Sequence, residues 1–242
     1  MKKYFIFLIF FNLILSVVFL QTPFDYWIDD DSGHFSFAQD ITNPLDIFFD
    51  QNTISNIGFS LTPVQMLSYW FDYRISGTSP MWPYLHNCIL FLFTTLLLFS
   101  VLKDYLSRNI CLFVCISWQL LPSTISIHEF ISARHYMEGL FFALASFKFL
   151  KLSDSSSLVL GNKKLFKKLF ILLMYFCLLL SCLCKEIYVT AAIPAIFMLL
   201  ATKRRFFQSF CVISIAIFYI MYRYWALGDL KGRYIIFDLN II

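Results

Sequence analysis

The sequence predicts an all-α fold, a polytopic membrane helix bundle with about seven spans and a long first outer loop that carries surface helices. Three observations predict it. Hydrophobic residues make up 60% of the 242 positions and charged residues only 14%, against roughly 45–50% and about 25% in soluble domains. The apolar residues form long runs. Basic residues gather in alternate connections between these runs, as they do in the cytoplasmic loops of membrane proteins.

The same composition excludes other classes of protein. Aromatic residues make up 20% of the chain, whereas disordered chains are poor in aromatics and rich in charge. The net charge of +4 is not gathered into one basic surface, so no nucleic acid is expected as a partner. The seven cysteines lie within or at the edge of apolar runs. We expect them to pack between helices as small apolar side chains.

Seven apolar segments approach the length of about 20 residues, or about 17 at the short end, that a spanning helix needs. They cover residues 4–20, 82–102, 110–122, 137–152, 169–184, 187–201 and 206–225. The third, fourth and sixth are short and are expected to include flanking polar residues or to tilt little. A cleaved signal peptide is the alternative for the first segment, but it offers no small-x-small cleavage site.

The basic residues set the orientation. With the N-terminus in the cytoplasm, the inner connections hold 13 of the 19 Lys and Arg residues, and the outer side holds 13 of the 15 acidic ones. The inner connections are residues 1–3, 103–109, 148–168 and 202–205. We therefore expect an integral membrane protein with its C-terminus outside. Residues 1–242 are expected to form one membrane module, in which 226–242 is an outer tail or the start of a missing part.

The connection 21–81 is the most informative part of the sequence. It carries eight acidic residues, which are Asp25, Asp29, Asp30, Asp31, Asp40, Asp46, Asp50 and Asp72. Thr62 and Pro63 form a helix start, and the apolar residues that follow predict a helix over 63–75 on the outer leaflet. Asn43 and Pro44 predict the start of a second surface helix. Because polar residues concentrate here, function is expected in this loop.

Three adjacent carboxylates, Asp29, Asp30 and Asp31, follow the first span. Adjacent carboxylates repel one another, so their clustering needs an explanation. One explanation is a divalent cation, Mg²⁺ or Mn²⁺, because hard ions take oxygen ligands. Another is a general base, because a neighbouring like charge raises the pKa of a carboxyl group. A solvated acidic turn is the third, and the residues alone leave all three open.

Further ionisable residues are expected on the same outer side. They are Glu129 and Arg134 after the third span, Lys185 and Glu186 after the fifth, and Arg223 near the end of the seventh. Ionisable groups at membrane depth are costly and tend to mark functional sites. Arg134 could bind a phosphate with its planar fork and Lys185 as a point charge. The structural alternatives are interface snorkelling for Arg134 and a helix-end ion pair for Lys185 with Glu186.

This order of motifs resembles the GT-C class of membrane glycosyltransferases, in particular bacterial relatives of the transmembrane O-mannosyltransferases that often carry tetratricopeptide repeats. The resemblance covers roughly residues 20–202, the catalytic module of that class. Its motifs are matched by Asp29-Asp30, Thr62-Pro63-Val64, Pro122 with Ile131-Ser132-Ala133-Arg134, Cys184-Lys185-Glu186 and Pro194. Thr62 stands where the family has Arg, and Glu129 stands three residues later than the family's acidic residue. Relatives usually continue with further spans beyond the length of this chain.

The resemblance implies transfer of a sugar from a polyprenyl-phosphate donor to an acceptor on the outer face of a bacterial inner membrane. Asp29 or Asp30 would be the base or the carboxylate near the metal. Arg134 and Lys185 would hold the departing lipid phosphate, and Glu186 would orient Lys185. The alternative is an inactive or truncated homologue that assists membrane assembly with a partner subunit. A transporter is disfavoured, because the charges lie at the ends of the spans and not near their middles.

Overall fold

The computed structural model describes residues 2–19, 31–56, 61–154, 163–200 and 206–228, and it contains no strand within these ranges. The longer helices are α1 (Lys2–Phe19), α5 (Pro63–Ser76), α6 (Met81–Leu102), α7 (Arg108–Gln119), α9 (Arg134–Asp154), α10 (Lys163–Cys184) and α12 (Phe206–Leu227). The shorter ones are α2 (Asp31–Asp40), α3 (Asp46–Phe49), α4 (Gln51–Asn56), α8 (Pro122–Glu129), α11 (Ala192–Leu200) and the 3₁₀ helices η1 (Ile131–Ala133) and η2 (Glu186–Ala191).

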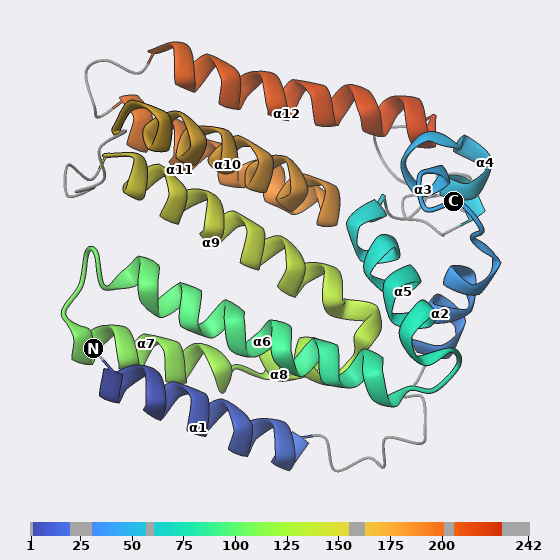
Figure 1. The fold of residues 1–242 in the computed structure, drawn as a ribbon, viewed down its shortest axis with the longest axis horizontal. Helices are drawn as coiled ribbons and strands as arrows, with labels where there is room; N and C mark the ends of the chain where they lie inside the picture. The colour runs from blue at the N-terminus through green and yellow to red at the C-terminus, as the bar shows by residue number, and fades with distance from the viewer. Residues whose placement is uncertain (1, 20–30, 57–60, 155–162, 201–205, 229–242) are drawn as a thin grey trace, which may run out of the picture.

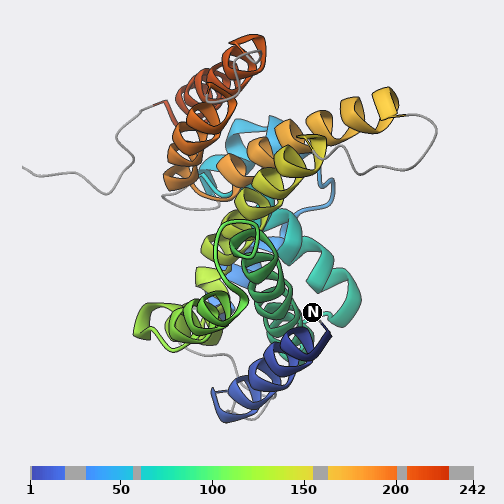
Figure 2. The ribbon, with the colours of Figure 1, turned by 90° about the vertical axis from the view of Figure 1, so that its left-hand side faces the viewer.

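The helices α1, α6, α7, α9, α10, α11 and α12 extend roughly along one direction, and α2 to α5 gather at one end of them (Figure 1). We call this the α5 end. In the end-on view α12 and α1 lie at opposite sides, with α9 and α10 between them (Figure 2). The α5 end therefore collects the first turns of α6 and α9 and the last turns of α10 and α12.

Three described helices are long and apolar enough to cross a membrane: Met81–Leu102, Leu165–Cys184 and Gln208–Leu227. The helices α7 and α8 add a fourth if they count as one broken span, bent by 63°. The prediction of an all-helical protein with membrane-spanning helices is supported at this level. The prediction of seven spans is not.

The span count differs because several predicted segments are not single apolar helices. The segment 110–122 ends as helix α7 at Gln119, and Pro122, which cannot continue a helix, starts α8 in a new direction. The segment 187–201 divides into η2 and the nine-residue helix α11. The segment 137–152 lies within α9, where Glu138, Lys148 and Lys151 interrupt the apolar run. The predicted inner connection 148–168 is also shorter, because α9 continues to Asp154 and α10 begins at Lys163.

The predicted helix over 63–75 is confirmed as α5. Pro63 occupies its first turn, where the missing backbone N–H would have no helical partner. Gly77 ends it with φ +60°, a conformation that favours glycine, and its N–H donates to the Tyr73 carbonyl oxygen at 2.8 Å. The second surface helix, expected from Asn43 and Pro44, begins at Asp46 as the short helix α3.

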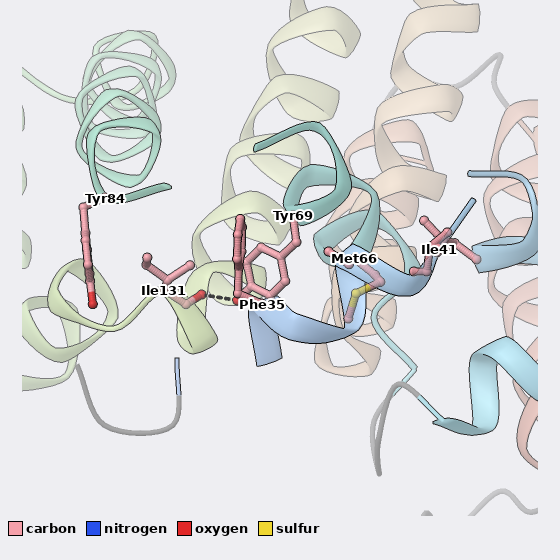
Figure 3. Packing of buried hydrophobic residues seen from close by; sticks show 8 residues of the cluster. Phe35, Ile41, Met66, Tyr69, Tyr84 and Ile131 are labelled. Carbon is pink, nitrogen blue, oxygen red and sulfur yellow. Dashed lines mark hydrogen bonds between the residues drawn. The ribbon is translucent and has the colours of Figure 1, made fainter. Parts of the chain in front are cut away.

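A buried aromatic and aliphatic cluster fixes α5 against its neighbours. Phe35 of α2 meets the Tyr69 ring of α5 edge-on, with centroids 6.0 Å apart. The Tyr69 hydroxyl donates to the backbone oxygen of Ile131 in η1 at 2.5 Å, as Figure 3 shows. Tyr84 from α6 completes the same cluster. The helix α2, the consecutive helices α5 and α6, and the distant η1 are thereby held together at the α5 end.

Candidate functional site

The acidic residues of the first loop that the structure describes mostly serve the fold. The Asp50 carboxylate accepts from the Thr53 N–H at 3.0 Å and caps α4. One Asp46 oxygen accepts from the Asn43 amide at 2.8 Å. The two predicted catalytic residues, Asp29 and Asp30, lie outside the described residues.

Asp31 is buried, with 1% of its surface exposed. One carboxylate oxygen accepts from the N–H of Ser132 at 2.7 Å. The other accepts from the N–H of Ile131 at 2.9 Å and from the Tyr84 hydroxyl at 3.2 Å. These N–H groups open the short helix η1, so Asp31 caps that helix from a distant part of the chain.

This use of Asp31 bears on the predicted Mg²⁺ or Mn²⁺ site. Both of its oxygens already accept hydrogen bonds from the protein, and a ligand for a hard cation would have to give them up. Within the described ranges, no group of three or more His, Cys, Asp or Glu side chains is placed to hold a metal ion. The metal set of Asp29, Asp30 and Asp31 stays a prediction, because two of its members are not described.

Arg134 lies at the centre of a buried polar cluster and is fully enclosed. Its guanidinium donates to a carboxylate oxygen of Asp72 at 2.5 Å, to the Pro83 carbonyl oxygen at 2.7 Å and to the Ser68 hydroxyl at 3.2 Å. The Tyr69 ring lies 5.1 Å from its central carbon. Arg134 thus joins α9 to α5 and α6 through its two terminal nitrogens, while its buried Nε has no hydrogen-bond partner among the described residues.

Asp72 and His86 belong to the same cluster, and sequence reasoning assigned neither. Asp72 is 1% exposed, and its second oxygen lies 2.8 Å from Nδ1 of His86 on α6. Burial raises the pKa of the Asp72 carboxyl, but the positive charge of Arg134 and the contact with His86 outweigh it, so the pKa is below its ordinary value. Asp72 is therefore ionised at neutral pH.

Lys185, Glu186 and Arg223 form a second group of charges, which we call the cation pair because two cations share one carboxylate. Lys185 Nζ lies 3.8 Å from one Glu186 oxygen, and Arg223 Nη1 lies 3.4 Å from the other. Glu186 is about one-third exposed, and both cations are mostly buried. Burial lowers the pKa of Lys185, and the neighbouring carboxylate opposes this shift only in part.

The backbone around Lys185 places the cation pair. The helix α10 ends at Cys184, and Lys185 is extended, with φ −160° and ψ 141°, before η2 begins. Tyr188 of η2 donates its hydroxyl to the Tyr136 carbonyl oxygen of α9. Gly139 allows this approach, because a Cβ there would lie 2.1 Å from the Tyr188 ring. The break in the helix and the absence of a side chain at Gly139 together hold Lys185 at the α5 end.

The two clusters are adjacent along α9. Lys185 Nζ lies 5.6 Å from the centre of the Tyr136 ring, two residues after Arg134. Glu138 follows one turn after Arg134, is 5% exposed, and has one oxygen without a hydrogen-bond partner among the described residues. The predicted Arg134, Lys185 and Glu186 are therefore brought to the same end of the bundle. Glu129 is half-buried at the last residue of α8 and joins neither cluster.

An apolar groove of about 290 Å³ lies elsewhere, between α1 and α6. Its lining includes Leu13, Val17, Leu85 and Ile89, with Asn12 as its most buried polar residue. Because α1 and α12 are at opposite sides of the molecule (Figure 2), this groove is separate from the cation pair.

No family model matches the chain, and neither a curated protein nor a solved structure is significantly similar to it. The resemblance to GT-C glycosyltransferases consequently remains a prediction that rests on the residues quoted above.

Proposed function

We propose that the protein is a membrane glycosyltransferase that moves a sugar from a polyprenyl-phosphate donor to an acceptor at the α5 end of the bundle. The observation that carries the proposal is the cation pair, in which Lys185 and Arg223 face a single carboxylate, Glu186. The group has one positive charge in excess. An anion that bound there would gain two cationic contacts.

The surplus charge suits a phosphate leaving group. When the bond between the sugar and the phosphate breaks, negative charge grows on the phosphate oxygens. Cations that are already in position stabilise this charge more in the transition state than in the bound donor. Arg223 donates in a plane and Lys185 acts as a point charge, while Glu186 keeps Lys185 in place. Asp29 and Asp30 remain the candidates from sequence for activating the acceptor, with or without a divalent cation.

Arg134 takes a different part in this proposal from the one first expected. Its guanidinium is used by Asp72, Ser68 and a backbone carbonyl, so it supports the site through α5 and α6. The distribution of basic residues predicts that the N-terminus lies in the cytoplasm and the α5 end outside. A bacterial inner membrane follows from the family resemblance alone.

An inactive homologue that assists assembly is the second candidate. One observation favours it: two of the predicted site residues, Asp31 and Arg134, make hydrogen bonds within the protein. Such a protein would keep the fold of the α5 end without transferring sugar.

The test is a transfer assay on the purified chain in lipid nanodiscs, with polyprenyl-phosphate sugars as donors. Replacing Lys185 and Arg223 together by Ala should lower the rate by at least about 100-fold, since one lost charge-stabilising donor typically costs about 10²–10³. Lys148→Ala is the matched control, because Lys148 forms its ion pair with Asp104 at the opposite end of α9. An unchanged rate in the double variant would refute this phosphate site. The absence of transfer by the unaltered protein would favour the assembly role.

A further inference from the structure

The carboxylate of Asp72 orients the imidazole ring of His86. Nδ1 of His86 lies 2.8 Å from one Asp72 oxygen. The other Asp72 oxygen is held by Arg134 at 2.5 Å. Asp72 is buried, whereas the His86 side chain is 33% exposed. A buried cation thus fixes a buried carboxylate, and that carboxylate holds a partly exposed imidazole.

The neighbours of Nδ1 assign the proton on the ring. A carboxylate can only accept a hydrogen bond and a guanidinium can only donate one. Nδ1 is 2.8 Å from Asp72 but 3.4 Å from Arg134 Nη1, so the shorter contact, with the carboxylate, dominates. Nδ1 therefore carries a proton and donates it to Asp72, which leaves the lone pair of the neutral ring on Nε2.

In this geometry Nε2 of His86 is free to accept a proton from a bound molecule. Among the residues that the structure describes, no hydrogen bond to it is found, and His86 keeps one-third of its side chain exposed. His128 shows the opposite case: it is 2% exposed, and its Nε2 lies 3.2 Å from the Ser16 hydroxyl. His128 is thus an enclosed imidazole, whereas His86 has a carboxylate at Nδ1 and an exposed edge at Nε2.

We propose that His86 is the proton acceptor of the site, with Asp72 and Arg134 as positioning residues. This inference rests on the proposed function and assigns activation of the acceptor to His86 instead of Asp29 or Asp30. The acceptor it implies is a hydroxyl compound that reaches the α5 end beside the first turns of α6. The carboxylate behind the ring stabilises the imidazolium that forms when Nε2 takes a proton, as in other pairs of carboxylate and histidine.

The step balances without a further reagent. The O–H bond of the acceptor breaks and its proton moves to Nε2 of His86. The freed electron pair on that oxygen forms a bond with the anomeric carbon of the sugar. The bond from this carbon to the phosphate oxygen breaks, and its electron pair leaves with the lipid phosphate near Lys185 and Arg223. His86 then releases its proton to water.

A purely structural role explains the contacts less well. Arg134 alone neutralises the Asp72 charge, and its contacts with Ser68 and the Pro83 carbonyl hold α5 and α6 together. The fold has no further need of an imidazole on Asp72 that keeps one-third of its surface exposed.

The first experiment needs no substrate. Nitrogen-15 NMR of the unaltered protein in micelles should find the His86 proton on Nδ1. Acylation by diethyl pyrocarbonate, followed by peptide mass spectrometry, should label His86 at least tenfold faster than His128. A proton on Nε2, or labelling of His86 no faster than that of His128, would overturn the inference whether or not the protein transfers sugar.

The second experiment separates this inference from the proposed function. His86→Gln should lower kcat for transfer by about 10²–10⁴, the range for a lost general base, and leave KM for the lipid donor unchanged. Asp72→Asn should slow labelling of His86, with Asp72→Glu as the conservative variant that restores it. Full kcat in His86→Gln would overturn the inference while the transferase proposal stands. If the unaltered protein transfers nothing, the transferase proposal fails and the catalytic role of His86 fails with it.

Discussion

Two groups of charges lie next to each other along α9, and they differ in charge balance and in burial. Around Arg134, the guanidinium is fully enclosed and its charge is matched by Asp72. Around Lys185, two cations share Glu186, and that carboxylate is one-third exposed. Matched charge with full burial supports the fold, whereas a cation in excess beside a partly exposed carboxylate is available to a ligand. The position of a charged residue in the sequence does not distinguish these cases, but its partners do.

The largest expected difference between the two groups is in stability, and it is tested by removing one cation from each group. Arg134→Met should lower the free energy of unfolding by about 3–5 kcal/mol, because it leaves the Asp72 carboxylate buried without its main partner. Lys185→Met should change it by less than about 1 kcal/mol, because Glu186 is one-third exposed and keeps Arg223 as a partner. The measurement is unfolding of each variant in mixed micelles. Similar losses in both variants would mean that the two groups do not differ in kind.

A paired substitution controls for the loss of Arg134 packing. Replacing Arg134 by Met and Asp72 by Leu together removes both charges. Such a double variant should recover much of the stability that Arg134→Met loses, since a buried ion pair often contributes little compared with apolar residues of similar volume. Recovery would assign the loss to the unpaired carboxylate. No recovery would assign it to packing.

A smaller effect is expected from the contact that positions the cation pair. Gly139→Ala places a Cβ 2.1 Å from the Tyr188 ring, so η2 has to move away from α9. Overpacking of this kind costs about 1–3 kcal/mol. It should also weaken lipid phosphate binding, because η2 follows Lys185 directly. Gly33→Ala in α2 is the matched control: no atom lies within 4 Å of the added Cβ, and neither property should fall.

The sequence predicted more of the fold than of the contacts within it. Apolar runs indicated where the long helices lie, and Pro63 indicated the start of α5. The number of spans was overestimated, because hydrophobicity does not register the bend at Pro122 or the 3₁₀ turn after Lys185. The 3₁₀ turn depends on contacts with other helices, which the local sequence does not contain, whereas Pro122 is a local signal that a count of apolar residues does not register.

The site was predicted in part for the same reason. Lys185 and Glu186 stood out as ions between two apolar runs. Asp72 did not, because its partner Arg134 is 62 residues away and a loop carboxylate looks the same with or without one. Asp31 was assigned to a metal site by its acidic neighbours, whereas its carboxylate accepts from backbone N–H groups about 100 residues further on. Such pairings become visible only when the chain is folded.

The smallest effects should appear in the dependence of stability on pH, in the acid range for Asp72 and in the alkaline range for Lys185. The pKa of Asp72 is below its ordinary value of 3.8, first because Arg134 outweighs the effect of burial. Its contribution to stability should be complete above pH 3.8 and be lost as the pH falls through the folded-state pKa. The pKa of Lys185 is also lowered, from 10.5, because burial disfavours its charge. The folded protein then releases this proton before the unfolded chain does, so the Lys185 contribution to stability should rise as the pH approaches 10.5.

Binding should respond in the other direction at alkaline pH, and this separates the two groups of charges. Only a protonated Lys185 attracts phosphate, so the affinity for a polyprenyl phosphate in nanodiscs should fall at a pH below 10.5, while stability does not. In Lys185→Met this alkaline loss of affinity should disappear, and the acid loss of stability due to Asp72 should stay. An alkaline loss that persists in Lys185→Met would place the phosphate elsewhere. It would leave the cation pair as a structural contact like that of Arg134 with Asp72.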